Sequence, residues 1–481
     1  MNRHLLLIGG GVLQVPVIEH ARALGVKVLC LDGNPSAPAR RLADWFETVD
    51  IKDKDACLAA ARSHQSAYRL DGVVTVGTDF STTVAWIADS LGLPGTPYEA
   101  ALRAKDKGLM RSCFEKNGVA SPRHQVVTSS SEPCDLPLPL VVKPADSMGA
   151  RGVRLASDAA ELRLAVTDAL QFSSTGRAVV EEYIDGPEFS LDAIVRGGQL
   201  VRCGLADRRI VFPPAFVELG HTFPSAASSE VIEAVWSEFE KGVKALGLSW
   251  GAAKGDVKYS PGRGAIIGEI ASRLSGGYMS GWTYPLTSGR SAVRWAVETA
   301  LGLELSSQPE ETSVPVAERA WIGLPGRIRA VRGVDLARSL PGVKEVFISV
   351  AAGSVTRFPR NNVEKLGNVI AVGATPAEAE AHARAARFAV AFEYERSSQT
   401  DAFLAGGAEH WWFPQARGAA DAGPGWLERG GGWLDAYGDS LGDLAARLEA
   451  EGLSPLSRGA VFWRALAVGG LNGARYAAEQ P

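Results

Sequence analysis

The sequence has few cysteines, no long apolar run and almost no net charge, and each absence excludes a class of protein. Its five cysteines are widely spaced among 481 residues, and none forms the CxxC pair of zinc and redox sites. No window approaches the ~18 uninterrupted apolar residues of a membrane span. With 50 Lys and Arg against 54 Asp and Glu, the chain lacks the basic surface that nucleic acid or an anionic membrane needs. We therefore expect reduced thiols and a cytoplasmic location, with neither nucleic acid nor a membrane as partner.

The length predicts several domains, because single domains usually hold roughly 100 to 200 residues. The composition, 46% hydrophobic and 22% charged, is typical of a globular protein. The amino terminus MNRHLLLIGGGVL has a basic start and an apolar run. Three glycines interrupt that run and no small-residue cleavage site follows, so the pattern predicts a first β-strand rather than a signal peptide.

Residues 1–103 alternate short apolar runs with longer amphipathic ones, such as LLLIG, VLQVPVIEHARAL and VKVLCLD. This alternation predicts βαβ units and a parallel sheet. A dinucleotide site is one interpretation, because Gly9, Gly10 and Gly11 join a strand to a helix and Asp32 ends the second strand. GGGVLQ lacks the third glycine of GxGxxG, however, and a tight turn needs glycine whether or not it binds phosphate. We therefore give this interpretation little weight.

The rest of the chain predicts three further units. Residues 104–305 mix helix-like stretches with strand-like ones, such as PLVVKP and GAIIGEIA, and predict a larger mixed domain. Residues 306–397, with VKEVFISV, NVIAVG and the helix AEAEAHARAARFAVAF, predict a small α+β cap. Residues 398–481 form an extension rich in Gly, Ala and Trp. Its tryptophans are Trp411, Trp412, Trp426, Trp433 and Trp463.

The segment LVVKPADSMGARGVRL predicts a phosphate-binding hairpin. A strand ends at Lys143 and Pro144, and Ser147, Gly149 and Gly152 lie in a short loop before the next strand. Such a loop can turn its backbone amides toward phosphates while the lysine reaches an α- or β-phosphate. The alternative is an ordinary flexible β-turn.

About thirty residues later, VVEEYIDGPEFSLD places carboxylates on both sides of a turn. One carboxylate at the base of such a linker can bond an adenine amino group, and one after the turn can take ribose hydroxyls. The candidates are Glu181, Glu182 and Glu188. The alternative is that they are solvated charges of an edge strand.

Two successive apolar strands, AAKGDVKY and AIIGEIASRLSGG, carry Asp256 and Glu269. Inward carboxylates on neighbouring strands are costly unless they are paired or bind a cation, and hard oxygen ligands suit magnesium on nucleotide phosphates. Arg273 follows four residues after Glu269, and its guanidinium fork fits a phosphate or carboxylate. The alternative for Asp256 is an ion pair with Lys254 or Lys258.

These motifs, in this order, resemble the ATP-grasp superfamily, and specifically its carboxylate-amine ligases of the L-amino acid ligase kind. The resemblance covers roughly residues 1–395. It implies an ATP-grasp fold that follows a Rossmann-like α/β domain and precedes an α+β cap, so that residues 1–103 would help to hold substrate rather than a dinucleotide. It also implies an ATP-dependent ligase that forms a carbon–nitrogen bond through an acyl phosphate and releases ADP.

The resemblance assigns roles residue by residue. AKDKGLMRSCFEKNG is similar to the opening helix of the family, whose nucleotide-binding lysine falls on Lys107, with Lys105 as the rival. The hinge EEYIDGPE implies that Glu181 and the backbone of Ile184 bind adenine. The full expected set is Lys107, Lys143, Ser147, Gly149, Gly152, Glu181, Glu182, Ile184 and Glu188 for ATP, Asp256 and Glu269 for the metal, and Arg273 with Lys143 for catalysis.

For the substrates, FVELGHTFPS resembles amino-acid ligases that make dipeptides, which implies a pocket lined by His221, Arg273, Gly276 and Gly277. A lone histidine is also often purely structural. The expected cofactors are ATP and magnesium, which manganese can replace. The expected partners are small-molecule carboxylate and amine substrates, and a homodimer is common among similar proteins.

Two departures from the family pattern leave alternatives open. Ala271 stands where many members have Asn two residues after the metal-binding glutamate, which puts a second metal in doubt. The extension 398–481 resembles nothing in the family; it could cover the site, mediate dimerisation or select an aromatic substrate. The remaining alternatives are a carboxylase or purine-pathway ligase of the same superfamily, and an ATP-binding protein without catalysis.

Overall fold

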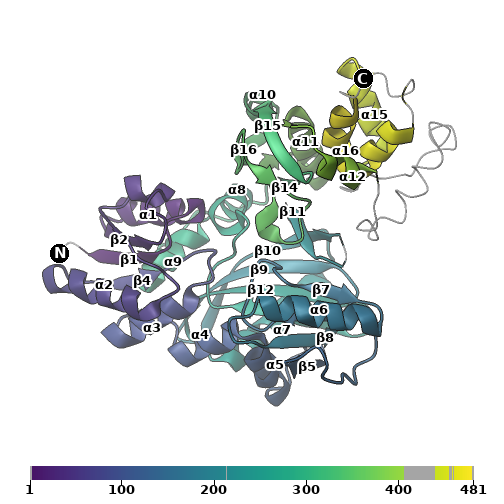
Figure 1. The fold of residues 1–481 in the computed structure, drawn as a ribbon. Helices are drawn as coiled ribbons and strands as arrows, with labels where there is room; N and C mark the ends of the chain where they lie inside the picture. Colours follow the sequence, from purple (N-terminus) through teal and green to yellow (C-terminus); the bar gives the residue numbers. More distant parts are fainter. Residues whose placement is uncertain (1–2, 213, 406–438, 454–457, 459, 479–481) are drawn as a thin grey trace.

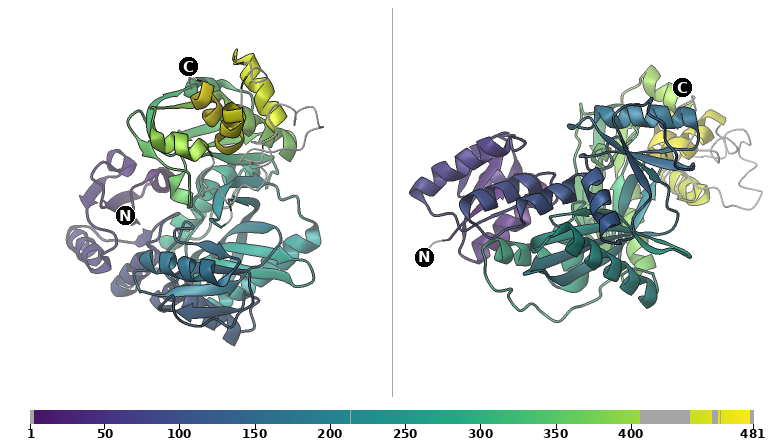
Figure 2. Two further views of the ribbon diagram at one scale, coloured as in Figure 1. Left: turned by 45° about the vertical axis from the view of Figure 1, so that its right-hand side comes forward. Right: turned by 90° about the horizontal axis from the view of Figure 1, so that it is seen from below.

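The computed structural model describes residues 3–212, 214–405, 439–453, 458 and 460–478. It contains three units, in agreement with the α/β and α+β organisation predicted above, and the described part of the extension packs on the third unit (Figure 1). The right view in Figure 2 shows the first unit at one end of the molecule and the terminal helices at the other. Within the described ranges, no helix is both long and apolar enough to cross a membrane. The domain boundaries given above stay predictions.

The first unit is a parallel four-stranded sheet with strand order β3-β2-β1-β4, as the alternating pattern predicts. The turn after β1 is closed by the chain itself, because the Gly10 amide donates to Asp32 Oδ2 at 2.6 Å. The carboxylate that a dinucleotide site would use is therefore already engaged. The elements are β1 (His4–Ile8), β2 (Lys27–Asp32), β3 (Trp45–Thr48), β4 (Gly72–Val74), α1 (Val15–Ala23), α2 (Lys54–Ala67) and α3 (Ser81–Leu91).

The opening stretch of the second unit differs from the single helix that its sequence predicts. It forms α4 (Tyr98–Lys105) and α5 (Lys107–Lys116), because Asp106 adopts an extended backbone between them. Its side chain accepts a hydrogen bond from Leu109 N at 2.9 Å and so caps α5. The break makes Lys107 the first residue of a helix and buries it, with 3% exposure.

A small antiparallel sheet with the order β5-β8-β6-β7 carries the predicted phosphate loop. The loop connects β6 to β7, and α6 packs against the sheet through an apolar cluster that includes Ala165, Val166 and Ala169. The bounds are β5 (His124–Val127), β6 (Leu140–Pro144), β7 (Arg154–Ala156), β8 (Ala178–Glu182) and α6 (Ala159–Gln171).

An eight-stranded sheet joins the second unit to the third, in the order β13-β12-β9-β10-β11-β14-β18-β16. Helix α7 packs on β12 and β13 through Val235, Phe239 and Val243. Helix α9 packs against α1 of the first unit. The bounds are β9 (Glu188–Arg196), β10 (Gln199–Val211), β11 (Val217–Phe223), β12 (Trp250–Ser260), β13 (Gly264–Ala271), β14 (Val316–Trp321), β16 (Val343–Ile348), β18 (Gly367–Val372), α7 (Ser229–Leu246) and α9 (Ala292–Ala300).

The third unit contains a further strand that the sequence analysis reads as helix. The predicted helix ends at Ala389, and its last apolar residues form β19 against β15, because Val390 turns to an extended backbone. Trp463 is buried against this unit in α16, whereas the other four tryptophans of the extension lie outside the described residues. The bounds are β15 (Gly326–Arg332), β17 (Val355–Thr356), β19 (Ala391–Tyr394), α10 (Val334–Ser339), α11 (Pro376–Ala389), α12 (Ser398–Leu404), α15 (Leu441–Ala450) and α16 (Ala460–Ala478).

Candidate active site

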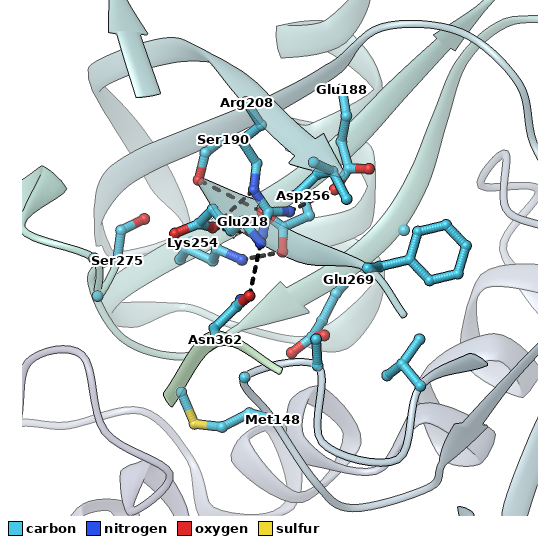
Figure 3. Close-up of a pocket in the computed structure, with 18 of the residues that line it drawn as sticks. Met148, Glu188, Ser190, Arg208, Glu218, Lys254, Asp256, Glu269, Ser275 and Asn362 are labelled. Carbon is cyan, nitrogen blue, oxygen red and sulfur yellow. Dashed lines mark hydrogen bonds and ion pairs between the residues drawn. The ribbon is translucent and has the colours of Figure 1, made fainter. Parts of the chain in front are cut away.

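A cavity of about 520 Å³ opens where the three units meet. Met148 of the phosphate loop lies on one side of it, Glu188 and Asp256 lie on the other, and the third unit contributes Asn362 (Figure 3). None of the described residues after 397 lines it. Of the residues predicted for the site, the cavity brings together Lys107, Lys143, Ser147, Gly149, Glu181, Glu182, Ile184, Glu188, His221, Asp256, Glu269, Arg273, Gly276 and Gly277.

Both predicted nucleotide-binding lysines face this cavity. Lys107 Nζ donates to the carbonyl oxygen of Ser147 at 2.7 Å and lies 3.7 Å from Glu269 Oε2. Lys143 Nζ lies 2.7 Å from Glu181 Oε2. The rival Lys105 donates to the carbonyl oxygen of Asp79 at 3.2 Å and does not line the cavity. The geometry therefore favours Lys107 over Lys105.

Glu181 is fully enclosed between two cations. Its second oxygen accepts a hydrogen bond from Arg111 Nε at 2.9 Å. Burial alone would raise the pKa of Glu181, but the guanidinium of Arg111 and the ammonium of Lys143 outweigh it and hold the pKa at about 2. The carboxylate is thus ionised at neutral pH, and it fixes Lys143 in place at the cavity wall.

The two predicted glycines of the phosphate loop have different surroundings. Gly149 has φ +69° and lines the cavity, whereas Gly152, also at φ +69°, does not. A Cβ on Gly152 would lie 2.8 Å from Phe172 Cδ2 and 3.0 Å from Pro144 Cγ. Gly152 is therefore explained by backbone conformation and packing rather than by an approach to ligand.

The hinge after β8 points its three carboxylates in different directions. Glu181 lies inside, while Glu182 accepts from Arg123 Nε at 2.9 Å and from Arg263 at 2.9 Å. Glu188 lies at the start of β9 and pairs with Arg208 at 2.5 Å. Ile184 lines the cavity and is buried. Glu181 and Glu182 are thus each held by two cations. The adenine contacts expected of the hinge stay predictions.

Asp256 and Glu269 lie opposite each other on β12 and β13, as expected, but differ in their partners. Glu269 faces the cavity with Lys107 as its cation (Figure 3). Burial alone would raise the pKa of Glu269, but Lys107 and Lys254 hold it at about 2. Asp256 instead accepts from Lys254, the ion pair considered above as the alternative, and lies 2.8 Å from Arg208 NH1.

These two carboxylates differ in how well they fit a metal ion. In the described part of the chain, no group of three or more His, Cys, Asp or Glu side chains is arranged to hold a metal. Glu269 fits a hard cation, since it is ionised and its nearest cation is 3.7 Å away. Both oxygens of Asp256 face cations in this structure. Its assignment as a metal ligand stays a prediction.

Arg208, which is not among the predicted site residues, forms ion pairs with three carboxylates. It comes from β10 and contacts carboxylates of three other strands: Glu188 on β9 at 2.5 Å, Glu218 on β11 at 2.7 Å and Asp256 on β12 at 2.8 Å (Figure 3). Despite burial, these neighbours, Asp256 first, raise the pKa of the Arg208 guanidinium. It therefore ties the strands together at the cavity floor.

Glu218, His221 and Glu318 form a cluster, called the acidic cluster below, where the third unit meets β11. His221 Nδ1 lies 2.7 Å from Glu318 Oε2, and its Nε2 lies 3.6 Å from Glu218 Oε2. Burial opposes ionisation of Glu218, but His221 and Arg208 outweigh it and lower the pKa of its carboxyl well below the usual range. The predicted His221 thus belongs to a polar network. Glu218 is not among the predicted residues, and its spacing of three from His221 gives no signal, because side chains three apart on a regular strand face opposite sides; the pairing of β10 and β11 is irregular here.

Arg273 and the two glycines after it form the remaining wall. Arg273 donates to the carbonyl oxygens of Thr78 and Leu274, each at 3.1 Å. Gly277 has φ +62°, and a Cβ there would lie 2.9 Å from Glu218 Oε1. The glycine therefore leaves room beside the acidic cluster.

Comparisons with known proteins agree with this architecture. The sequence matches the ATP-grasp N-terminal domain over residues 18–95, the ATP-grasp domain over residues 136–281 and the L-amino acid ligase C-terminal domain 2 over residues 321–395. An L-amino acid ligase structure from Bacillus licheniformis superposes with a TM-score of 0.72 at 22% identity, covering 82% of this chain and 99% of that one. A phosphoribosylglycinamide synthetase structure from Anaerococcus prevotii gives 0.63 at 21% identity, covering 82% and 100%.

Two curated relatives show the reach of the sequence similarity. An uncharacterized protein of Sinorhizobium fredii is 25% identical over 374 residues, which cover 76% of this chain and 77% of that protein. Carnosine synthase 1 of Mus musculus is 25% identical over 417 residues, covering 79% of this chain, but the match spans only 49% of the length of that enzyme. Together with the fold, the three domain matches confirm the resemblance: the chain contains ATP-grasp N-terminal and ATP-grasp domains followed by an L-amino acid ligase C-terminal domain 2, which are domains of ATP-dependent ligases.

Proposed function

We propose that this chain is a carboxylate-amine ligase that uses ATP to convert a carboxylate into an acyl phosphate and then joins it to an amine, with an amino acid as one substrate. The observation that carries the proposal is that the cavity has a basic end and an acidic end. Lys107 and Lys143 face it from the phosphate-loop side, and Glu218 and His221 face it from the side of the third unit.

The basic end, at Lys107 and Lys143, suits a nucleoside triphosphate. Lys107, Lys143 and the amides of the loop around Gly149 offer positive charge and hydrogen-bond donors to phosphate oxygens. Glu269 is the residue that would hold magnesium, which when bound neutralises phosphate charge. Ile184 and Glu188 stand at the hinge, where adenine and ribose are expected. Catalysis at this end consists mainly of positioning and charge neutralisation.

The acidic end suits the ammonium group of an amino acid. The Glu218 carboxylate lines the cavity, and while Arg208 pairs with its Oε2, its Oε1 lies 3.9 Å from Lys365 Nζ, too far for a hydrogen bond, so Oε1 can accept from an ammonium group. His221 stands beside it, and its ring is fixed by Glu318, which is fully buried. Bicarbonate and formate have no ammonium group for these residues to bind. This cluster therefore supports an amino acid over bicarbonate or formate as substrate.

Arg273 lines the same cavity, with its Nη2 3.9 Å from Met148 Sδ of the phosphate loop. We infer that it faces the carboxylate of a substrate whose ammonium group is held by Glu218. We assign to Arg273 the stabilisation of the acyl phosphate and of the oxyanion that forms when the amine attacks. The amine displaces phosphate from the acyl carbon, so the products are an amide, ADP and phosphate.

The test is ADP release from magnesium-ATP with single amino acids and amino-acid pairs, with product masses recorded. The proposal predicts release that requires an amino acid, and a product whose mass is the sum of two substrates minus water. Release with bicarbonate or formate alone would favour the carboxylase or purine-pathway alternative. ATP-induced thermal stabilisation without any product across the panel would favour the non-catalytic alternative.

A further inference from the structure

Asn362 makes hydrogen bonds to two parts of the cavity that belong to different elements. It opens the short helix η4 (Asn362–Glu364) of the third unit and lines the cavity (Figure 3). Its backbone N donates to the carbonyl oxygen of Gly149 at 2.9 Å. Its side-chain Oδ1 accepts from the backbone N of Glu218 at 2.8 Å. One residue thus joins the phosphate loop to the strand that carries the acidic cluster.

The contact with β11 occurs where that strand lacks a neighbour on one side. Pairing between β11 and β14 is limited to Thr222 with Ala317 and Phe223 with Val316. At Glu218, four residues before Thr222, the Asn362 side chain takes the place of a strand carbonyl. Without this acceptor, the Glu218 N–H would lack its observed partner in a largely buried place, which is unfavourable.

The segment around Asn362 has further contacts that fix its position. Asn361 is buried and caps η4, with its Oδ1 accepting from Val363 N at 3.0 Å. Lys365, just beyond the helix, has its Nζ 3.9 Å from Glu218 Oε1. A shift of the phosphate loop would therefore act on η4 through Gly149, and η4 in turn on β11.

We propose that Asn362 is a positioning residue that couples closure of the phosphate loop over the nucleotide to the placement of Glu218 and His221 on β11. The inference rests on the proposed function in one respect, that the loop closes on a nucleotide. Since coupling between two sites is reciprocal, an ordered acidic cluster also favours the closed loop. The third unit thereby makes nucleotide binding and substrate binding depend on each other.

The experiment is hydrogen–deuterium exchange of the full chain, with and without magnesium and the non-hydrolysable analogue AMP-PNP, which needs no knowledge of the amino acid. In the wild type we expect the nucleotide to slow exchange both in the loop at residues 145–153 and in β11 at residues 217–223. In Asn362→Leu we expect the loop to respond as before, while the nucleotide-dependent slowing in β11 falls by on the order of fivefold.

Two further variants separate coupling from local damage. Asn362→Asp keeps an acceptor oxygen for the Glu218 amide, so it should retain the β11 response. Asn361→Ala removes the cap of η4 but neither bond of Asn362, so it should also retain that response. Loss of the response in Asn361→Ala as well as in Asn362→Leu would overturn the assignment to Asn362.

The outcomes for the coupling and for the proposed function are distinguishable. If the loop responds to AMP-PNP in the wild type and β11 does not, or if Asn362→Leu keeps the full β11 response, the coupling is wrong and the nucleotide site stands. If neither region responds in the wild type, both proposals fail. With a substrate pair in hand, Asn362→Leu should raise the KM for the amino acid more than it lowers kcat.

Discussion

Lys107 Nζ donates a hydrogen bond to the carbonyl oxygen of Ser147 at 2.7 Å, which joins the first residue of α5 to the phosphate loop. The same ammonium lies 3.7 Å from Glu269 Oε2. Lys107 is buried and lies next to both the loop and a carboxylate expected to bind metal, so its ammonium group is in position to bind a phosphate. Its contact with the loop also explains why the break at Asp106 matters, since an unbroken helix would place this side chain differently.

Replacing Lys107 with Met should weaken nucleotide binding, since it removes a charge-assisted hydrogen bond while keeping most of the apolar stem. We expect a loss of about 1.5 to 3 kcal/mol in binding of AMP-PNP, measured by calorimetry. Lys105→Met is the matched control, because Lys105 does not line the cavity. Equal losses in the two variants would contradict the placement of Lys107.

Replacing Glu269 with Gln should reduce ADP release by about a hundredfold or more, because the ionised carboxylate is the residue that fits magnesium. The measurement is ADP release over a range of magnesium concentrations, at saturating ATP. Glu233→Gln on α7, where the carboxylate pairs with Arg202 at the surface, is the control and should behave as the wild type. Full turnover in Glu269→Gln would refute the metal assignment.

Replacing Gly277 with Ala should impair the acidic end of the cavity and spare the nucleotide end. The added Cβ would require a left-handed backbone and would lie 2.9 Å from Glu218 Oε1. We expect a raised KM for the amino acid with unchanged AMP-PNP binding. Gly25→Ala is the control, because Gly25 has φ +69° but open space around it. A raised KM in both variants would show that strain alone is responsible.

Replacing Glu181 with Gln should destabilise the protein by about 3 kcal/mol at pH 7, since it leaves the buried Arg111 without its counter-charge and Lys143 without its ion pair. The pKa of Glu181 is lowered to about 2 from 4.5. Its stabilising contribution is therefore complete above pH 4.5 and is lost as the pH falls toward 2. The gap between the urea midpoints of wild type and variant should thus hold from pH 7 to about pH 5 and narrow as the pH falls to 3. A gap as wide at pH 3 as at pH 7 would contradict the ion-pair explanation.

Most of the fold could be predicted from the sequence, because its signals are local. The β1 run HLLLI and the β2 run KVLCLD are apolar strands bounded by glycines, and they form the expected parallel sheet. The motif KPADSMGARG is similarly local, so Lys143 and Gly149 could be placed together. Two helix boundaries were predicted wrongly. Asp106 caps a helix instead of continuing one, and Val390 ends α11, since capping and sheet pairing overrode helix periodicity.

The residues that complete the cavity could not be predicted, because no local pattern marks them. Arg208 lies in the unremarkable run ADRRIV, and its three partners come from strands that only the sheet order makes neighbours. Asn362 comes from the third unit, 144 residues after the Glu218 amide that it contacts. The pairing of Asp256 with Lys254 could be anticipated, since side chains two apart on a strand share a face.

The measurement that tests the central claim most directly is the transfer of oxygen-18 from a labelled amino-acid carboxylate to phosphate during ligation. Attack of the carboxylate on the γ-phosphorus, followed by attack of the amine on the acyl carbon, leaves one carboxylate oxygen on the released phosphate. We predict one labelled oxygen per phosphate molecule, detected by mass spectrometry, in step with formation of the amide. Unlabelled phosphate released together with the amide would contradict the acyl-phosphate mechanism.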